Sequence, residues 1–349
     1  MQYTHEAYMQ RCLELAQKGA GFVAPNPLVG AVLVFENRII GEGYHLQFGK
    51  EHAEVNCLAS VAEADLALVP LSTLYVSLEP CAHQGKTPPC VDLIIRHRIP
   101  KLVIGCKDPF EKVAGKGIAR LREAGIEVIE GVLEKEAVYL NRRFFCFHQK
   151  KRPYILLKWA ETGNGKMAGN SAERLLISNE YTNRLVHQWR SEEAAILIGT
   201  NTALVDNPQL TNRLYTGKSP LRMVIDKKLR LPTQLHLFDG SVRTILFNEI
   251  KQDTRQNPEY WLLKKEENTI RQILGICYQH EWQSILVEGG KELLQSFIDE
   301  GFWDEARLIQ NGRLRVSEGM DAPRLKKAPD RKEHLQSDTI FYYSSRASD

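Results

Sequence analysis

The segment TLYVSLEPCAHQGKTPPC, residues 73–90, decides the fold of the N-terminal half of this 349-residue chain. Its first six residues form a largely apolar run that predicts a buried strand, and a helix is predicted over 91–97. Upstream, His52-Ala53-Glu54 stands at the predicted start of another helix. Cys81 and Cys90 of the segment, together with the upstream histidine, supply two thiols and one imidazole.

One imidazole and two thiols can bind a zinc ion and leave its fourth coordination position open, which is typical of hydrolytic rather than structural zinc. We therefore predict a metal site formed by His52, Cys81 and Cys90. Zinc lowers the pKa of bound water from about 15.7 to roughly 7. Glu54 is predicted to be catalytic, moving that water's proton to the ring nitrogen and then to the departing ammonia. This pattern, H-x-E with downstream cysteines, is typical of zinc deaminases.

The expected helix starts support this assignment. His52 and Glu54 are two residues apart, a spacing that does not bring side chains together within a regular helix, so His52 should lie at the helix start. Thiols ionise more easily near helix N-termini, which favours Cys81 and Cys90 as ligands if each begins a helix. The other cysteines are expected to be small buried hydrophobic residues: Cys12, Cys57, Cys106, Cys146 and Cys277.

The order of helix and strand patterns predicts two α/β domains. Residues 1–147 alternate between the two patterns and include a hairpin at Glu36-Asn37, which indicates a largely parallel sheet covered on both faces. The basic stretch 148–153 is the predicted linker. Ser178 is expected to cap a helix that runs to Trp189. A second α/β series fills 154–349, with strands predicted over 154–157, 194–198, 221–225, 244–247, 284–287 and 339–343.

Composition argues against several classes of function. The net charge is only +3 and no basic run stands out, so a nucleic-acid partner is not expected. No stretch approaches the roughly 20 apolar residues of a membrane helix, and the N-terminus lacks the layout of a signal peptide. Seven cysteines argue against a disulfide framework. We expect a cytoplasmic enzyme that acts on a small molecule.

The loop between Cys81 and Cys90 is longer than the C-x-x-C of the common deaminase signature. It carries His83, Lys86 and Thr87. A cation beside the metal suits a substrate that has a phosphate near the ring to be deaminated. A solvated lysine at a loop tip is the alternative.

Five groups of residues resemble the bifunctional deaminase/reductase family of riboflavin biosynthesis. The resemblance implies a cytidine-deaminase-like three-layer α/β/α domain followed by a dihydrofolate-reductase-like α/β domain. It implies a phosphoribosyl pyrimidine substrate, 2,5-diamino-6-(5-phosphoribosylamino)pyrimidin-4(3H)-one, which loses its ring 2-amino group. The groups are Pro25 to Gly30, Gly41 to His45, His52 to Glu54, Glu79 to Cys90, and Asp108-Pro109 with Val113 to Gly115. The residues implied to bind this substrate are Asn26, His45, His83, Lys86 and Asp108.

The second half resembles the reductase of the same family, which uses NADPH to reduce the ribosyl group of the deaminated product to ribityl. The Gly289-Gly290 pair enters a helix, where backbone N–H groups can bind a phosphate, but it is not a Rossmann fingerprint. A homo-oligomer is expected. The resemblance places the substrate at Lys158, Arg174, Arg190, Leu210, Arg213 and Glu288. It places NADPH along Ala160, Leu176, Ser178, Thr202, Asp206 and Gly290. Without the resemblance, Arg190 and Arg213 could equally form surface salt bridges.

The chain departs from the family pattern at several positions, among them the expected proline-led strand beyond Ile309, which reads Gln310-Asn311-Gly312-Arg313. Phe110 follows Asp-Pro where the family often has Asn. In the second half, Asn164 and Asn207 each replace an Asp, Arg174 replaces a Ser, and Leu176 replaces a Trp. These differences concern substrate and cofactor contacts rather than the zinc chemistry.

Two other interpretations share part of this pattern. A nucleoside or transfer-RNA deaminase with an accessory non-reductase domain would have the same zinc motif, but the lack of a basic face and the Lys86 loop speak against it. A non-catalytic, zinc-stabilised binding module would need a fourth protein ligand, and none is evident.

Overall fold

The computed structural model describes residues 4–82, 88–110, 115–170 and 175–345. The chain divides into two compact units, residues 1–151 and 152–349. Helix α6 (Arg142–Lys150) extends into the expected linker at 148–153, so this stretch is partly helical and the division falls after Lys151. In the described ranges, no helix is both long and apolar enough to cross a bilayer.

The first unit is built on a five-stranded sheet of order β2-β1-β3-β4-β5. β3, β4 and β5 are parallel, whereas β1 pairs antiparallel with both β2 and β3. The prediction of a largely parallel sheet is therefore wrong for half of it. For β1 and β2 the reason is the turn at Glu36 and Asn37, where positive φ at both residues joins adjacent antiparallel strands. The strands are β1 (Gly30–Phe35), β2 (Arg38–Tyr44), β3 (Thr73–Leu78), β4 (Lys101–Cys106) and β5 (Glu127–Ile129).

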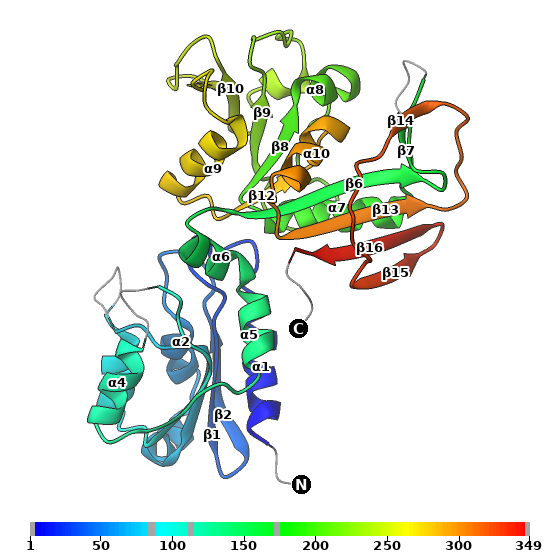
Figure 1. Ribbon diagram of the computed structural model, residues 1–349. Coiled ribbons are helices and arrows are strands. Elements are labelled where there is room, and N and C mark those ends of the chain that lie inside the picture. Colours follow the sequence, from blue (N-terminus) through cyan, green and yellow to red (C-terminus); the bar gives the residue numbers. More distant parts are fainter. Residues whose placement is uncertain (1–3, 83–87, 111–114, 171–174, 346–349) are drawn as a thin grey trace. The chain divides into compact units, whose positions relative to one another are not determined.

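Helices cover both faces of this sheet because successive residues of β1 point to opposite sides. Ala31 and Leu33 pack in the cluster that contains residues of α2, α3 and α4. Val32 and Val34 pack against α1, and α5 contacts both α1 and β4. The three-layer α/β/α arrangement is confirmed (Figure 1). The helices are α1 (His5–Gln17), α2 (Ala53–Ala59), the 3-10 helix η1 (Glu63–Leu71), α3 (Cys90–Arg96), α4 (Lys116–Glu123) and α5 (Glu134–Leu140).

The second unit contains a nine-stranded sheet of order β11-β10-β9-β8-β12-β6-β13-β16-β15, and β14 and β7 form a separate pair. The pairings from β11 to β13 are all parallel, and β16 is antiparallel to both β13 and β15. The strands are β6 (Tyr154–Thr162), β7 (Lys166–Gly169), β8 (Ala195–Gly199), β9 (Leu221–Ile225), β10 (Thr244–Asn248), β11 (Glu259–Leu262), β12 (Ser284–Val287), β13 (Glu305–Asn311), β14 (Gly319–Asp321), β15 (Arg331–Leu335) and β16 (Asp338–Ser344).

Two layers of helices flank the larger sheet. Residues of α9 and α10 join Ile155 and Leu157 of β6 in the main core. On the opposite side, Trp189 of α7 packs with Ala160 and Ile340. The helices are α7 (Glu180–Glu192), α8 (Thr200–Asp206), the 3-10 helix η2 (His236–Phe238), α9 (Thr269–Gln279) and α10 (Lys291–Asp299).

The six strands predicted for the second half are confirmed. The prediction that Ser178 caps α7 is wrong. Asn179, not Ser178, precedes α7, and its side-chain oxygen accepts the N–H of Thr182 at 3.0 Å. The Asn179 amide also donates to the carbonyl of Leu335. Asn179 is therefore held by a distant segment as well as by its own helix.

Candidate active sites

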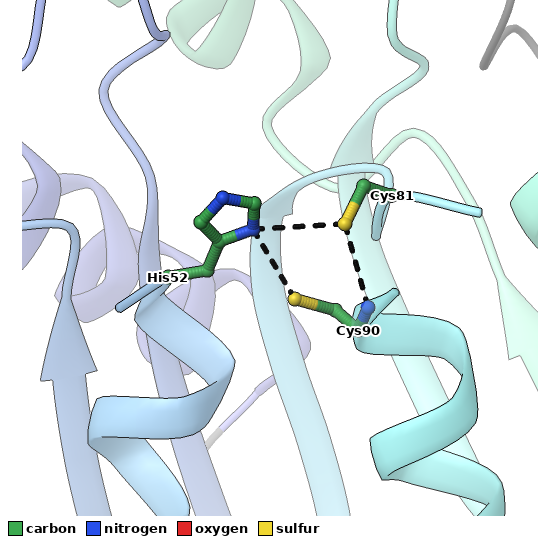
Figure 2. Close-up of side chains that lie close together, drawn as sticks. All are labelled: His52, Cys81 and Cys90. Carbon is green, nitrogen blue, oxygen red and sulfur yellow. Dashed lines mark hydrogen bonds between the residues drawn. The ribbon is translucent and has the colours of Figure 1, made fainter. Parts of the chain in front are cut away.

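Three side chains of the first unit converge as the sequence predicts: His52, Cys81 and Cys90 (Figure 2). Nδ1 of His52 lies 3.3 Å from Sγ of Cys90 and 3.6 Å from Sγ of Cys81, and the three ligand atoms lie within 4.8 Å of one another. A tetrahedral zinc ion requires ligand atoms roughly 3.5 to 3.8 Å apart, given its usual bond lengths. Among the described residues, no fourth histidine, cysteine or carboxylate joins this group. The donor set therefore fits a zinc ion with one open coordination position.

The ends of three elements position these ligands. His52 is the N-cap residue of α2, and Cys90 is the first residue of α3. Cys81 lies in the loop after β3 and does not begin a helix, contrary to the expectation for both cysteines. Its sulfur instead accepts the backbone N–H of Cys90 at 3.4 Å. The start of α3 therefore supports the charge of Cys81 from a neighbouring segment.

Ionisation of the two thiols is unequal. A hydrogen bond from Cys90, aided by one from His52, lowers the pKa of Cys81. The same interaction with Cys81, together with burial, raises the pKa of Cys90. The hydrogen bond to Cys81 also raises the pKa of His52. The lowered pKa favours the thiolate of Cys81, which is the form that binds metal.

Glu54 is buried in the first turn of α2, with 3% of its surface exposed. Burial, and secondarily the charge of Cys81, raises the pKa of its carboxyl group. Glu54 also interacts with the Cys90 thiol. A carboxyl group that binds a proton more readily than usual, next to the metal ligands, has the properties of a proton shuttle.

His45 and Asn26 adjoin the metal group. The ring of His45 lies edge-on to that of His52, with centroids 5.5 Å apart. Its Nδ1 bonds the carbonyl of Glu51 at 2.9 Å and must donate there, so Nε2 accepts from the Asn26 amide at 3.0 Å. Burial lowers the pKa of His45, which favours this neutral form.

Asp108 follows β4 and is 9% exposed. Burial raises the pKa of its carboxyl group to about 7. One carboxylate oxygen accepts the N–H of Phe110 at 2.8 Å, and the Phe110 ring lies 5.0 Å from that of His148. Two other predicted substrate residues, His83 and Lys86, lie outside the described residues.

The second unit brings together Lys158, Arg190 and Glu288, as expected. Arg190 binds both carboxylate oxygens of Glu288 at 2.8 and 2.9 Å, and Nζ of Lys158 lies 3.8 Å from the same group. Burial opposes ionisation of Glu288, but the two cations outweigh it and lower its pKa to about 2. Glu288 is therefore an anion at all physiological pH values.

A histidine that the sequence analysis did not select holds the next part of this site. Nδ1 of His187, on α7, accepts the backbone N–H of Arg213 at 2.9 Å. Burial, with Arg190 and Arg213, lowers the pKa of His187 to about 4. Leu210, another predicted substrate residue, is buried. Arg174 lies outside the described residues. His187 is three residues before Arg190, a predicted site residue, and this spacing on one helix was the available signal that both lie on the same face.

A cavity of about 730 Å³ lies beside the C-terminal ends of β8 and β9 and the start of α10. Of the predicted cofactor residues, Thr202 and Gly290 line it. Its lining also includes Lys227, Lys228 and Arg230, which the sequence analysis missed. Their position directly after a predicted strand was the available signal, because ligands of α/β sheets bind beyond the carboxyl ends of strands. The predicted residues that do not line it are Ala160, Leu176, Ser178 and Asp206.

Comparison with known proteins assigns each half of the chain to a family. The family described as cytidine and deoxycytidylate deaminase zinc-binding region matches residues 2–106, and the RibD C-terminal domain family matches residues 153–314. The fold and the site thus define a zinc-binding deaminase domain joined to a reductase domain.

Relatives that span both domains identify the family. Riboflavin biosynthesis protein RibD of Aquifex aeolicus is 41% identical over 85% of this chain and 84% of its own length. The Escherichia coli protein of that name is 36% identical over 86% and 85%. A Thermotoga maritima structure described as a diaminohydroxyphosphoribosylaminopyrimidine deaminase/5-amino-6-(5-phosphoribosylamino)uracil reductase is 37% identical, with a TM-score of 0.88 over 97% of each chain. The chain belongs to the riboflavin biosynthesis protein RibD family and is a bifunctional enzyme of that pathway.

Proposed function

We propose that this enzyme hydrolytically deaminates 2,5-diamino-6-(5-phosphoribosylamino)pyrimidin-4(3H)-one and then reduces the ribosyl group of the product to ribityl with NADPH. The observation that carries the first step is the group of His52, Cys81 and Cys90 with Glu54 beside it. The substrate follows from family membership, since the similar Thermotoga structure is named for this pair of reactions. We assign the deaminase to residues 1–147 and the reductase to 154–349, connected by 148–153.

In the deaminase, each residue has a separate task. His52, Cys81 and Cys90 would hold a zinc ion, whose Lewis acidity would lower the pKa of bound water from about 15.7 to roughly 7. Glu54 accepts the proton of the attacking water and delivers it first to the ring nitrogen and then to the leaving ammonia. Asn26 and His45, fixed by their mutual hydrogen bond, line the pyrimidine side of the site.

In the reductase, the ribosyl group contacts three charged side chains, those of Lys158, Arg190 and Glu288. Arg213 binds the phosphate of the substrate. NADPH occupies the cavity at the start of α10, where Gly290 precedes the helix and backbone N–H groups can bind a phosphate. Lys227, Lys228 and Arg230 provide positive charge for the additional phosphate that distinguishes NADPH from NADH. Lys227 also pairs with Glu249 at 3.2 Å, so the other two cations have the larger role.

The deciding experiment is the Glu54→Gln variant. It should retain one zinc ion per chain, measured by mass spectrometry, but release no ammonia from the phosphoribosyl pyrimidine. NADPH oxidation with the deaminated product should be unchanged and serves as an internal control for folding. Glu63→Gln, an exposed substitution in the same unit, should leave both activities intact. Full ammonia release by Glu54→Gln would exclude the shuttle, and deamination of RNA in place of the free pyrimidine would favour the transfer-RNA interpretation.

A cytoplasmic location and a homo-oligomeric state are part of the same proposal. The location follows from membership of a biosynthetic family that acts on a small molecule. Light scattering of the purified protein measures the second directly, and a single-chain mass would exclude it.

A further inference from the structure

Glu79 lies between β3 and the zinc ligand Cys81, and its side chain is 3% exposed. Its carboxylate accepts four backbone N–H groups. Oε2 accepts from Asp108 at 3.3 Å and Gly115 at 3.0 Å. Oε1 accepts from Gly117 at 3.0 Å and Ile118 at 3.4 Å. Both carboxylate oxygens therefore bind backbone of residues that lie about 30 to 40 positions further along the chain.

The backbone around this carboxylate fits it closely. A side chain at Gly117 would place its Cβ 2.4 Å from the carbonyl oxygen of Pro80 and 3.1 Å from Oε1 of Glu79. Gly115 has a φ of 74°, a conformation that favours glycine. The N–H of Glu79 also donates to the carbonyl of Cys106, which keeps the ends of β3 and β4 together. The two glycines thus allow the start of α4 to approach the loop that carries Cys81.

We propose that Glu79 is a positioning residue of the deaminase, which fixes Asp108 relative to the zinc ligand Cys81. Glu79 is two residues before Cys81, and its side chain binds the N–H of Asp108 directly. The carboxylate of Asp108 in turn accepts the N–H of Phe110, so Glu79 holds the backbone of Asp108 and the following turn holds its side chain. This inference rests on the proposed function, with Asp108 contacting the phosphoribosyl pyrimidine as the family resemblance implies.

The isosteric variant Glu79→Gln tests this role. An amide offers only one acceptor oxygen, and its NH₂ group would face backbone N–H donors that need acceptors. Asp108 and residues 115–118 should therefore shift. A displacement of about 1 Å in a substrate-positioning group can lower the reaction efficiency by roughly 100-fold. We expect the KM of the deaminase to rise by about 10-fold to 100-fold, with a smaller change in kcat, unchanged zinc content and unchanged reductase kinetics.

Three further measurements separate positioning from other roles. Glu79→Asp keeps the charge but is one methylene shorter, so its KM should also rise. Gly117→Ala, which pushes α4 away from Pro80, should reproduce the effect. In both Glu79 variants, hydrogen exchange of the amides at 115–118 should become faster. Glu127→Gln, an exposed substitution on β5, is the matched control and should behave as wild type.

Failure of this proposal can be distinguished from failure of the proposed function. Ammonia release from the pyrimidine by the wild-type enzyme tests the proposed function itself. An unchanged KM and unchanged amide exchange in Glu79→Gln would show that Glu79 does not position the segment. Loss of zinc, or a wild-type KM in Glu79→Asp, would show instead that its charge acts on the metal site.

Discussion

The buried ion pair between Glu288 and Arg190 gives a quantitative prediction for stability. Glu288 has a pKa of about 2 in the folded protein, whereas the ordinary pKa of a glutamate side chain is 4.5. At 1.36 kcal/mol per pKa unit, this difference corresponds to about 3 kcal/mol in favour of folding. Because the folded pKa is depressed, this contribution is fully present above about pH 5 and is lost as the pH falls towards 2. Removing one partner of a buried pair typically costs about 3 to 5 kcal/mol, a similar amount.

The Glu288→Gln variant should therefore be less stable than the wild type by about 3 kcal/mol at pH 7, and the difference should shrink between pH 5 and pH 3. Urea unfolding followed by tryptophan fluorescence measures it selectively, because all five tryptophans lie in the second unit. Glu266→Gln, at an exposed position, is the control. A difference below about 1 kcal/mol at pH 7, or one that does not change with pH, would refute the electrostatic argument.

Three other predictions concern the reductase unit. Lys158→Ala should impair NADPH oxidation while ammonia release continues at the wild-type rate, and equal loss of both activities would contradict separate sites. The double variant of Lys228 and Arg230 to alanine should raise the KM for NADPH by about 10-fold to 100-fold, the value of one or two charge-assisted hydrogen bonds, with the KM for NADH unchanged. Asn164→Asp should lower the unfolding free energy by about 1 kcal/mol without raising reductase kcat, since it loses a hydrogen bond to the carbonyl of Val316. A faster enzyme in that last case would show that the family's aspartate has a catalytic advantage.

The sequence was most informative where the chemistry depends on residues near the ends of regular elements. His52 at a helix start and Cys90 at another could be predicted because each is marked by a local pattern of apolar residues and turns. The parallel strands of the second unit were also predictable, since short apolar runs between helical patterns identify buried strands. The five other cysteines are all buried, as their apolar neighbours suggested.

Features that depend on distant contacts were not predictable in this way. Ser178 and Asn179 are both good capping residues, and the choice between them is made by Asp338 and Leu335, more than 150 residues away. Strand β13 was missed, although it pairs with both β6 and β16. The role of Glu79 depends on four amides beyond β4, which no local pattern indicates.

The departures of this chain from its family can be explained at two positions. Asn164 accepts from Thr162 at 2.8 Å and donates to the carbonyl of Val316 at 2.7 Å, and an aspartate could not make the second bond. Asn207 has a φ of 37°, a conformation that asparagine adopts readily, and its side-chain oxygen accepts the N–H of His236. Each asparagine therefore stabilises a turn of its own chain, and neither requires a change in Lys158, Arg190 or Glu288. Because these three residues retain their ion pairs, the reductase chemistry of this enzyme is expected to persist despite the substitutions.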